Sequence, residues 1–143
     1  MGDLSPNFSR QEFACHCCGK LPPDWLPGET PPLVNALEQL RAAAGNQGVI
    51  IVSGFRCVRH NRAVGGEPDS QHLIGKAADI HLNGHTLPQT YEVAQAIPPF
   101  VEGGIGYYPE QHFVHLDVRG HEARWGWLNG RYVSIAAALR EQA

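Results

Sequence analysis

Two segments of this sequence alternate between apolar and polar side chains, which is the period of a β-strand. Residues 77–82 read AADIHL, and residues 112–119 read HFVHLDVR. Because successive side chains of a strand point to opposite faces, each strand would turn one apolar face to a core and keep acids and imidazoles on the other. The polar faces carry Asp79, His81, Phe113, His115, Asp117 and Arg119. The fold must therefore contain a sheet with ionisable groups on one side.

Three further stretches have the features of helices. The chain between Pro31 and Gly45 repeats apolar residues at the helical period, with a proline at its start and a glycine at its end. Residues 88–97 have the same character, and the two prolines that follow should end that helix. We expect a terminal helix in the tail 131–143. Residues 1–30 predict an irregular arm with one short helical turn.

Two more segments are typical of strands. Residues 48–53, GVIIVS, form a β-branched run bounded by glycine, which predicts a buried strand. Residues 103–108 predict a strand that pairs with 112–119 as a hairpin through Pro109 and Glu110. Between these strands, residues 54–75 are polar and rich in glycine, and such long loops are often functional.

Composition restricts the domain count and the partners. With 143 residues, 43% of them hydrophobic and 17% charged, the chain fits one domain over residues 1–143. Its 11 basic and 14 acidic residues give a net charge of −3, so it offers no uniform basic field to nucleic acid or an anionic membrane. The N-terminus, MGDLSPNFSR, lacks the regions of a secretory signal. We expect a monomer made in the cytoplasm, with neither nucleic acid nor a membrane as partner.

Histidine is the unusual component, with 8 residues in so short a chain. His72 ends the polar loop, Asp79 follows on one predicted strand, and His115 lies on the polar face of another. Two imidazoles and a carboxylate suit zinc, and three protein ligands leave a fourth position for the water that hydrolysis needs. The sequence therefore predicts a catalytic metal site, the alternative being the polar rim of an unrelated pocket.

Five motifs follow one another along the chain: SGFR at 53–56, NRAVGG at 61–66, SQH at 70–72, GKAADI at 75–80 and FVHLDVR at 113–119. Together they resemble the successive motifs of the zinc D-alanyl-D-alanine carboxypeptidases and related murein endopeptidases. The resemblance extends from about Phe8 to Trp127, which is most of the chain. Its closest subgroup includes phage lysis enzymes.

The resemblance implies an α+β fold, in which a small antiparallel sheet is flanked by helices as in the hedgehog signalling domain. It implies a zinc ion held by His72, Asp79 and His115, in a peptidase that hydrolyses D-alanine-containing bonds of peptidoglycan stem peptides. Carboxypeptidase and endopeptidase activity both stay open, because the loops that close the cleft decide between them. Such an enzyme, lacking an export signal, would reach the cell wall only after release.

The general base is the least defined residue of the predicted site. Many members of the family carry a glutamate three residues before the last zinc ligand or a histidine two residues before it, where this sequence has His112 and Phe113. On a regular strand His112 would point away from His115, whereas Asp117 would share its face about 7 Å along the strand. We favour Asp117 as the base, with His112 as the alternative. Asp117 has a second role open to it, orienting a ligand imidazole.

Other side chains have two readings each. Arg56 resembles the family arginine that faces the scissile carbonyl, where it would stabilise an oxyanion or bind a substrate carboxylate, and the alternative is a surface salt bridge. Ser70 resembles the serine that anchors the substrate, and the alternative is a turn residue. His81 either supports the site or faces solvent. Trp125 and Trp127 either line the cleft or close the core.

The cysteines raise a separate possibility. Cys15 and Cys18, together with Cys57 and His60, have the ligand types and pair spacing of a closed structural zinc site. A second metal would fix the irregular arm to the loop that carries Arg56. A disulfide from Cys15 or Cys18 to Cys57, or free thiols, are the alternatives.

A function of another class competes with hydrolysis. The chain would then be a non-catalytic, zinc-bearing binding module of hedgehog-like fold, with a partner in the cleft. An open coordination position and release of amino groups from murein distinguish the enzyme from the module.

Overall fold

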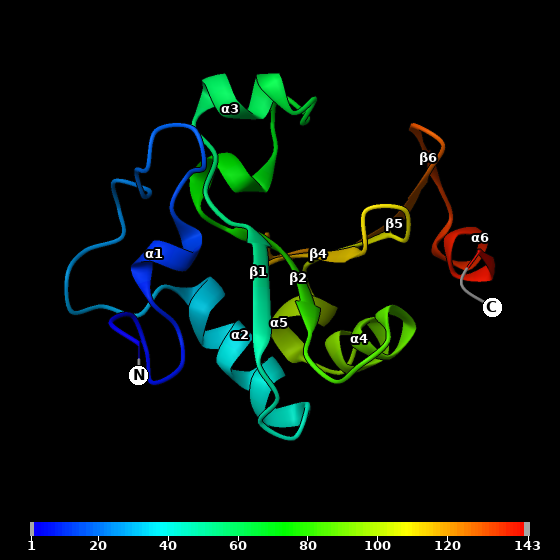
Figure 1. Ribbon diagram of the computed structural model, residues 1–143, viewed down its shortest axis with the longest axis horizontal. Helices are drawn as coiled ribbons and strands as arrows, with labels where there is room; N and C mark the ends of the chain where they lie inside the picture. Colours follow the sequence, from blue (N-terminus) through cyan, green and yellow to red (C-terminus); the bar gives the residue numbers. More distant parts are fainter. Residues whose placement is uncertain (1, 142–143) are drawn as a thin grey trace.

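A six-stranded sheet runs through the computed structural model, which describes residues 2–141 (Figure 1). In spatial order, β1-β2-β4-β3-β5-β6, neighbouring strands are antiparallel except for the parallel pair β3 and β5. The strands are β1 (Val49–Ser53), β2 (Ala77–Leu82), β3 (Gly104–Tyr108), β4 (Phe113–Asp117), β5 (Ala123–Leu128) and β6 (Arg131–Val133). The α+β class is confirmed, with one parallel pair added to the expected antiparallel sheet.

Short helices surround the sheet. They are α1 (Arg10–Phe13), α2 (Pro32–Ala43), α3 (Val58–Ala63), α4 (Leu87–Ala94), α5 (Pro98–Val101) and α6 (Ile135–Arg140), with a 3₁₀ turn, η1 (Gln71–Ile74). The helix expected between Pro31 and Gly45 is confirmed as α2. The helix expected at 88–97 ends earlier, at Ala94, and Pro98 begins α5. Proline fits the first turn of a helix because its missing N–H would be unpaired there anyway.

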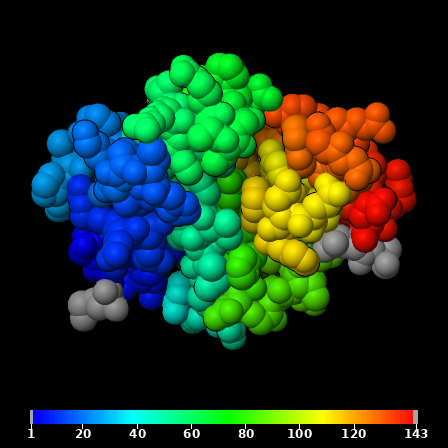
Figure 2. All heavy atoms as spheres, turned by 45° about the horizontal axis from the view of Figure 1, so that its top comes forward, coloured from blue at the N-terminus to red at the C-terminus, as the bar shows by residue number. Residues whose placement is uncertain are grey.

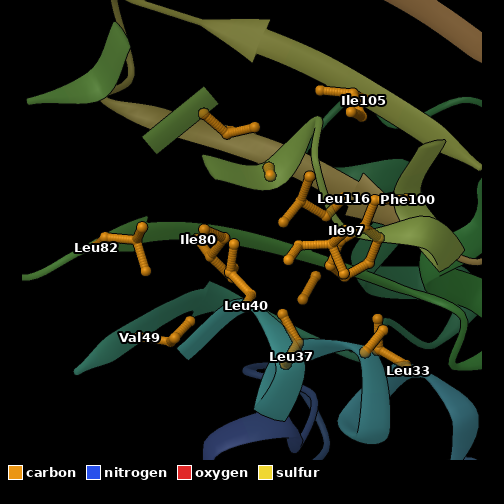
Figure 3. Close-up of a cluster of buried hydrophobic side chains, with 14 of the residues drawn as sticks. Leu33, Leu37, Leu40, Val49, Ile80, Leu82, Ile97, Phe100, Ile105 and Leu116 are labelled. Carbon is orange, nitrogen blue, oxygen red and sulfur yellow. The ribbon is translucent and has the colours of Figure 1, made fainter. Parts of the chain in front are cut away.

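The core lies between α2 and the apolar face of the sheet. Figure 3 shows Leu33, Leu37 and Leu40 of α2 directed toward Ile80 of β2 and Leu116 of β4. Helix α4 packs on β2 and β4, helix α5 packs on β3 and β4, and residues of both helices join this cluster. Because the even-numbered residues of β2 and β4 supply the core, the odd-numbered ones are left for the opposite face. That face carries the site.

The edge strand β1 differs from its expectation. The β-branched run at 48–53 predicted a buried strand, yet Ile50 and Val52 are 39% and 38% exposed. The reason is its position, because β1 pairs with β2 on one side only. Val49 and Ile51 pack on the core, while the alternate residues face outward. The hydrophobic run alone does not distinguish an edge strand from a central one.

The C-terminal part contains more strand than expected. The tail predicted as helix from Arg131 begins with β6, and α6 follows only at Ile135. Strand β5 was not among the expected elements, because its sequence ARWGWL lacks the β-branched residues that mark strands. Gly126 of β5 lies against α6, where a Cβ atom would come within 2.7 Å of the Ala138 methyl group.

The N-terminal arm, residues 2–30, is irregular, as expected, and aromatic packing holds it. Phe13 lies between Phe8 and Trp25, at ring-centroid distances of 5.9 and 5.5 Å. The Phe55 N–H donates to the Phe13 carbonyl at 2.8 Å, which joins the arm to the segment after β1. Among residues 2–141, the helices are all too short or too polar to traverse a bilayer.

Candidate metal centre

The sheet register brings two of the predicted ligands together. Asp79 of β2 is directly opposite His115 of β4, on the face away from the core. His72 comes from η1, where the Ser70 hydroxyl accepts a hydrogen bond from the His72 N–H and Gly75 ends the turn at a φ of 71°. This left-handed conformation favours glycine, and it turns the chain from η1 into β2. One ligand atom from each of His72, Asp79 and His115 lies within 4.8 Å of the other two.

The hydrogen bonds of the two imidazoles leave lone pairs directed at the same point. His72 Nδ1 lies 2.7 Å from the Gly54 carbonyl oxygen, which accepts only, so Nδ1 carries the proton and Nε2 has the lone pair. His115 Nε2 lies 2.7 Å from Asp117 Oδ2, which leaves the lone pair on Nδ1. These two free nitrogens lie 3.2 and 3.1 Å from Asp79 Oδ1. Three acceptors that converge in this way need protons or a cation between them, and the donor set fits a divalent metal.

Each ligand is fixed by a partner on its far side. Asp117 accepts from His115 and, in turn, from the Gly104 N–H at 2.8 Å and from the Arg119 guanidinium at 2.7 and 2.9 Å. The second oxygen of Asp79, Oδ2, accepts from Arg56 at 3.2 Å. Such partners set the orientation and tautomer of metal ligands.

The site is buried and its charges are compensated. Asp79, His72 and His115 are 2%, 2% and 6% exposed, and Asp117 is fully buried. When protons lie between these ligand atoms, burial opposes ionisation of Asp79, but the charge of His72 and hydrogen bonds from both imidazoles outweigh it, so its pKa lies well below the ordinary value. The pKa of Asp117 is lowered against burial by His115 and Arg119. Burial lowers the pKa of His115, yet the hydrogen bond to Asp117 raises it above the usual value.

The three side chains lie in the wall of a cleft of about 670 Å³. Much of the cleft lining belongs to the polar loop 54–75, the stretch for which a functional role was expected. Residues from β3, β4, β5 and β6 also line the cleft. A cleft of this size accommodates an extended ligand, with the candidate metal position on its surface.

Comparison with known proteins agrees with this arrangement. A model of the Peptidase M15 family matches residues 6–117, a span that contains all three candidate ligands. The chain belongs to the peptidase M15 family. The family resemblance drawn from the motifs is thereby confirmed.

Several relatives share this part of the chain. It is 32% identical over 101 residues to the peptidoglycan L,D-endopeptidase MepK of Escherichia coli, covering 66% of this chain and 53% of that protein. The corresponding protein of Shigella flexneri gives the same values. The probable peptidoglycan L,D-endopeptidase MepK of Haemophilus influenzae is 30% identical over 77 residues. The chain spans about half the length of the curated relatives it matches.

Asp117 and His112 were considered as the general base of this M15 site. Neither side chain faces the point where the three candidate ligands converge. Asp117 is engaged on the Nε2 side of His115, away from the Nδ1 lone pair that faces the other ligands. Its contacts are those of the orienting role left open for it. His112 is exposed in the turn before β4, with a φ of 60°, and it is absent from the described residues that line the cleft. The regular-strand position considered for His112 was wrong, because β4 begins only at Phe113.

Arg56 lies in the cleft wall and is held at three points. Its guanidinium donates to Asp79, to Asn61 Oδ1 at 3.2 Å and to Ser53 Oγ at 3.4 Å. The ion pair with Asp79 is buried, with the Arg56 side chain 14% exposed, so the surface salt bridge considered for Arg56 is wrong. Ser70 lines the cleft and also has the turn role, because its hydroxyl accepts from the His72 N–H.

Aromatic residues form another part of the cleft lining. Trp125 and Trp127 both line the cleft, which confirms the first of the two readings for them. The Trp125 indole N–H donates to the Tyr108 hydroxyl at 2.9 Å, and its ring lies 5.1 Å from that of His115. Gly106 makes this approach feasible, because a Cβ atom there would lie 2.6 Å from the indole. His81, which was weighed as a supporting residue, is half-buried and outside the cleft lining as described.

Sequence reasoning missed the supporting roles of Arg119 and Asn61. Arg119 holds Asp117, lines the cleft and lies 5.3 Å from the Trp125 ring centre. Asn61 is buried, accepts from Arg56 and donates to the Glu67 carbonyl at 2.8 Å, which fixes the loop. Both residues belong to the five sequence motifs, and this membership could have indicated that they support the site. The Tyr132 hydroxyl also donates to Glu67 Oε1 at 2.8 Å, a contact over 65 residues that no local pattern indicates.

Proposed function

We propose that this protein is a zinc-dependent metallopeptidase that hydrolyses bonds in peptidoglycan stem peptides. The observation that carries the proposal is the convergence of three lone pairs, from His72, Asp79 and His115, in the wall of an extended cleft. Membership of the peptidase M15 family and the names of the relatives, which are peptidoglycan endopeptidases, support the reaction class and the substrate.

The donor set fits zinc in number and chemistry. Two neutral imidazoles and one carboxylate are common ligands of catalytic zinc, which keeps a further position for water or substrate. When bound, zinc supplies an acidified water for attack and a Lewis acid for the scissile carbonyl. His72 Nε2, His115 Nδ1 and Asp79 Oδ1 are the atoms that would hold it.

The protein's own residues orient the site and bind the substrate. Asp117 acts as a positioning residue, because its carboxylate keeps the His115 proton on Nε2 and the lone pair on Nδ1. Arg56 holds the second carboxylate oxygen of Asp79 in place, and its position in the cleft allows it to face a carbonyl or carboxylate of the peptide. Ser70, beside His72, contributes a hydroxyl to the same wall.

The proton acceptor in this proposal is a cleft residue, and not Asp117 or His112. Glu67 and Asp69 supply further carboxylates to the lining. We expect one of the variants Glu67→Gln and Asp69→Asn to lose most of the release of amino groups from sacculi. The other variant serves as the matched control, because it also replaces one cleft carboxylate by its amide.

The bond cleaved is proposed to be internal to the peptide. The relatives are named L,D-endopeptidases, which favours an endopeptidase acting between an L-centre and a D-centre over a carboxypeptidase that removes a terminal D-alanine. Bonds next to D-alanine are the specific alternative within the same chemistry.

Digestion of purified sacculi tests the proposal. The zinc-loaded protein should release new amino groups, and the masses of the fragments identify the bond. His72→Ala should remove this release while the circular dichroism spectrum stays unchanged. A protein that binds zinc at these ligands but releases no amino groups from any murein type would be the non-catalytic binding module instead.

A further inference from the structure

A second cluster of metal-binding side chains lies outside the proposed active site. The sulfur atoms of Cys15, Cys18 and Cys57 lie within 4.8 Å of one another. Cys15 and Cys18 belong to the arm after α1, and Cys57 immediately precedes α3. Figure 2 shows the arm, in blue, packed against the green region that contains α3. Segments 42 residues apart along the chain therefore contribute sulfur to one point.

The backbone around Cys15 is folded as a tight turn. The Gly19 N–H donates to the Cys15 carbonyl at 2.8 Å, and the Cys15 N–H donates to the Lys20 carbonyl at 2.9 Å. Gly19 has a φ of 72°, the left-handed conformation in which glycine is favoured. This turn directs the side chains at both ends of the Cys-x-x-Cys spacing toward Cys57.

Backbone N–H groups are directed at the sulfur atoms. The Cys57 N–H donates to Cys15 Sγ and the His60 N–H donates to Cys57 Sγ, both at 3.4 Å. Donors of this kind stabilise thiolates, which are the form that binds metal.

Three converging sulfur atoms are better explained by a metal than by a disulfide. A disulfide would use two of the cysteines and leave the third beside it, whereas one ion engages all three. The four cysteines, all within the part of the chain that is described, are free thiols. Cys15 is buried and Cys57 half-buried, so a bound ion would be partly shielded from solvent.

We propose that Cys15, Cys18 and Cys57 bind a structural zinc ion, with His60 as the fourth ligand. Cys57 and His60 are three residues apart, as are Cys15 and Cys18. This separation within each pair is common among the ligands of structural zinc sites. The His60 nitrogens lie outside the cluster that the three sulfurs form, so this side chain must turn inward on binding. Its ring is half-buried and 6.0 Å from that of His16.

Such a site would connect the arm to the proposed active site. Cys57 follows Arg56, whose guanidinium holds Asp79, and Phe55 bonds the backbone of Phe13 in the arm. Zinc at the cysteines would thus fix both ends of the segment that positions Arg56. Its role is structural, because four protein ligands leave no position for substrate.

Zinc content per chain tests the proposal without any assay of hydrolysis. Protein prepared with zinc under reducing conditions should contain two zinc ions per chain by plasma mass spectrometry. Cys57→Ser and Cys15→Ser should each keep only the zinc at the histidine site, and His72→Ala should keep only the zinc at the cysteine site. The double variant Cys57→Ser with His72→Ala should contain none. Cys17→Ser is the matched control and should keep both, because Cys17 is exposed and outside the cluster.

Cobalt substitution gives a second readout on the wild-type chain. The cobalt form should have an intense thiolate-to-metal charge-transfer band that persists in His72→Ala and disappears in Cys57→Ser. A band absent from the wild type, or a disulfide between two of the three cysteines by mass spectrometry of the freshly reduced and desalted protein, would overturn the site. Both results are independent of peptidase activity, so the two proposals can fail separately.

The assignment of His60 as the fourth ligand is tested by comparing two histidine variants. His60→Ala should weaken zinc binding at the cysteines at least tenfold in competition with a chelator, and His16→Ala should leave it unchanged. Equal affinity in His60→Ala and the wild type would overturn the assignment of His60.

Discussion

The two candidate metal sites are built in opposite ways. His72, Asp79 and His115 are held by a sheet register and a 3₁₀ turn, and each has a partner on its far side. Cys15, Cys18 and Cys57 lie on an irregular arm and at the start of a short helix, held by turns and N–H···S bonds. The first site is organised by the fold before a metal arrives, whereas the second would itself organise the segments that form it.

This difference separates chemistry from stability. A catalytic site needs ligands held in place while one coordination position stays open, which a sheet and its outer partners provide. A structural site needs only to close, and the binding free energy of the ion then adds to the stability of the fold. Substitutions at the two sites should therefore have different consequences, which the following predictions test.

The largest expected effect is on hydrolysis. His72→Ala removes a ligand and with it several kcal/mol of transition-state stabilisation by the metal, which corresponds to a rate loss of roughly 10³-fold or more. Cys57→Ser should lower the rate less than about tenfold, because it acts only through the position of Arg56. The measurement is release of amino groups from sacculi at equal protein concentration. Equal losses in both variants would contradict the separation.

Arg56 lies between the two sites and should have the next largest effect. Arg56→Lys keeps the charge but loses the fork that contacts Asp79, Asn61 and Ser53 together. We expect the rate constant kcat to fall roughly 10²-fold, as for loss of a fixed donor at a reacting carbonyl. Zinc content should remain unchanged. A variant with full kcat would show that Arg56 acts on neither the carbonyl nor Asp79.

The sequence predicted the grouping of the candidate metal ligands better than their surroundings. His72, Asp79 and His115 could be predicted as a group because strand alternation places two of them on polar faces and because the motifs occur in order. The role of each residue depends on contacts between segments that are far apart in the sequence. The orienting contact of Asp117 requires the Gly104 N–H from the neighbouring strand, and a Cβ atom on Gly104 would lie 2.2 Å from that carboxylate.

The fold shows the same division. Elements with clear local periodicity, α2 and β2, were predicted within two residues of their bounds. Strand β5 was missed because aromatic residues and glycine replace the β-branched pattern, and its parallel pairing with β3 is a tertiary feature. The exposed edge position of β1 likewise follows from the strand order and not from its sequence.

Asp117 should affect metal affinity more than stability. Asp117→Asn retains the shape of the side chain but weakens the charge-assisted bond to His115. Loss of such an outer partner typically lowers metal affinity about 10–100-fold. Competition with a chelator should show this decrease at the histidine site and none in the cobalt–thiolate band of the cysteine site. A decrease at both sites would mean that the two are coupled.

The smallest expected effect is on stability, and it concerns Tyr107 on the core face of the sheet, opposite the face that carries the histidine site. Tyr107 is fully buried, and within residues 2–141 its hydroxyl is the buried side-chain polar atom without a hydrogen-bond partner. Tyr107→Phe should therefore leave the free energy of unfolding unchanged or raise it by about 1 kcal/mol, because an unpaired buried hydroxyl is costly. Zinc content at both sites should stay at the wild-type value.

The pH dependence of this variant gives a sharper test. Burial raises the pKa of Tyr107 from 10.0 to about 12, so the folded state favours the protonated phenol. The resulting stability is fully present below pH 10 and is lost as the pH rises toward 12, because the unfolded chain releases the proton first. Denaturant unfolding of the wild type should show this loss relative to Tyr107→Phe over that interval. Parallel curves would mean that the phenol reaches solvent or a partner, and the core face would then be less closed than the site above it.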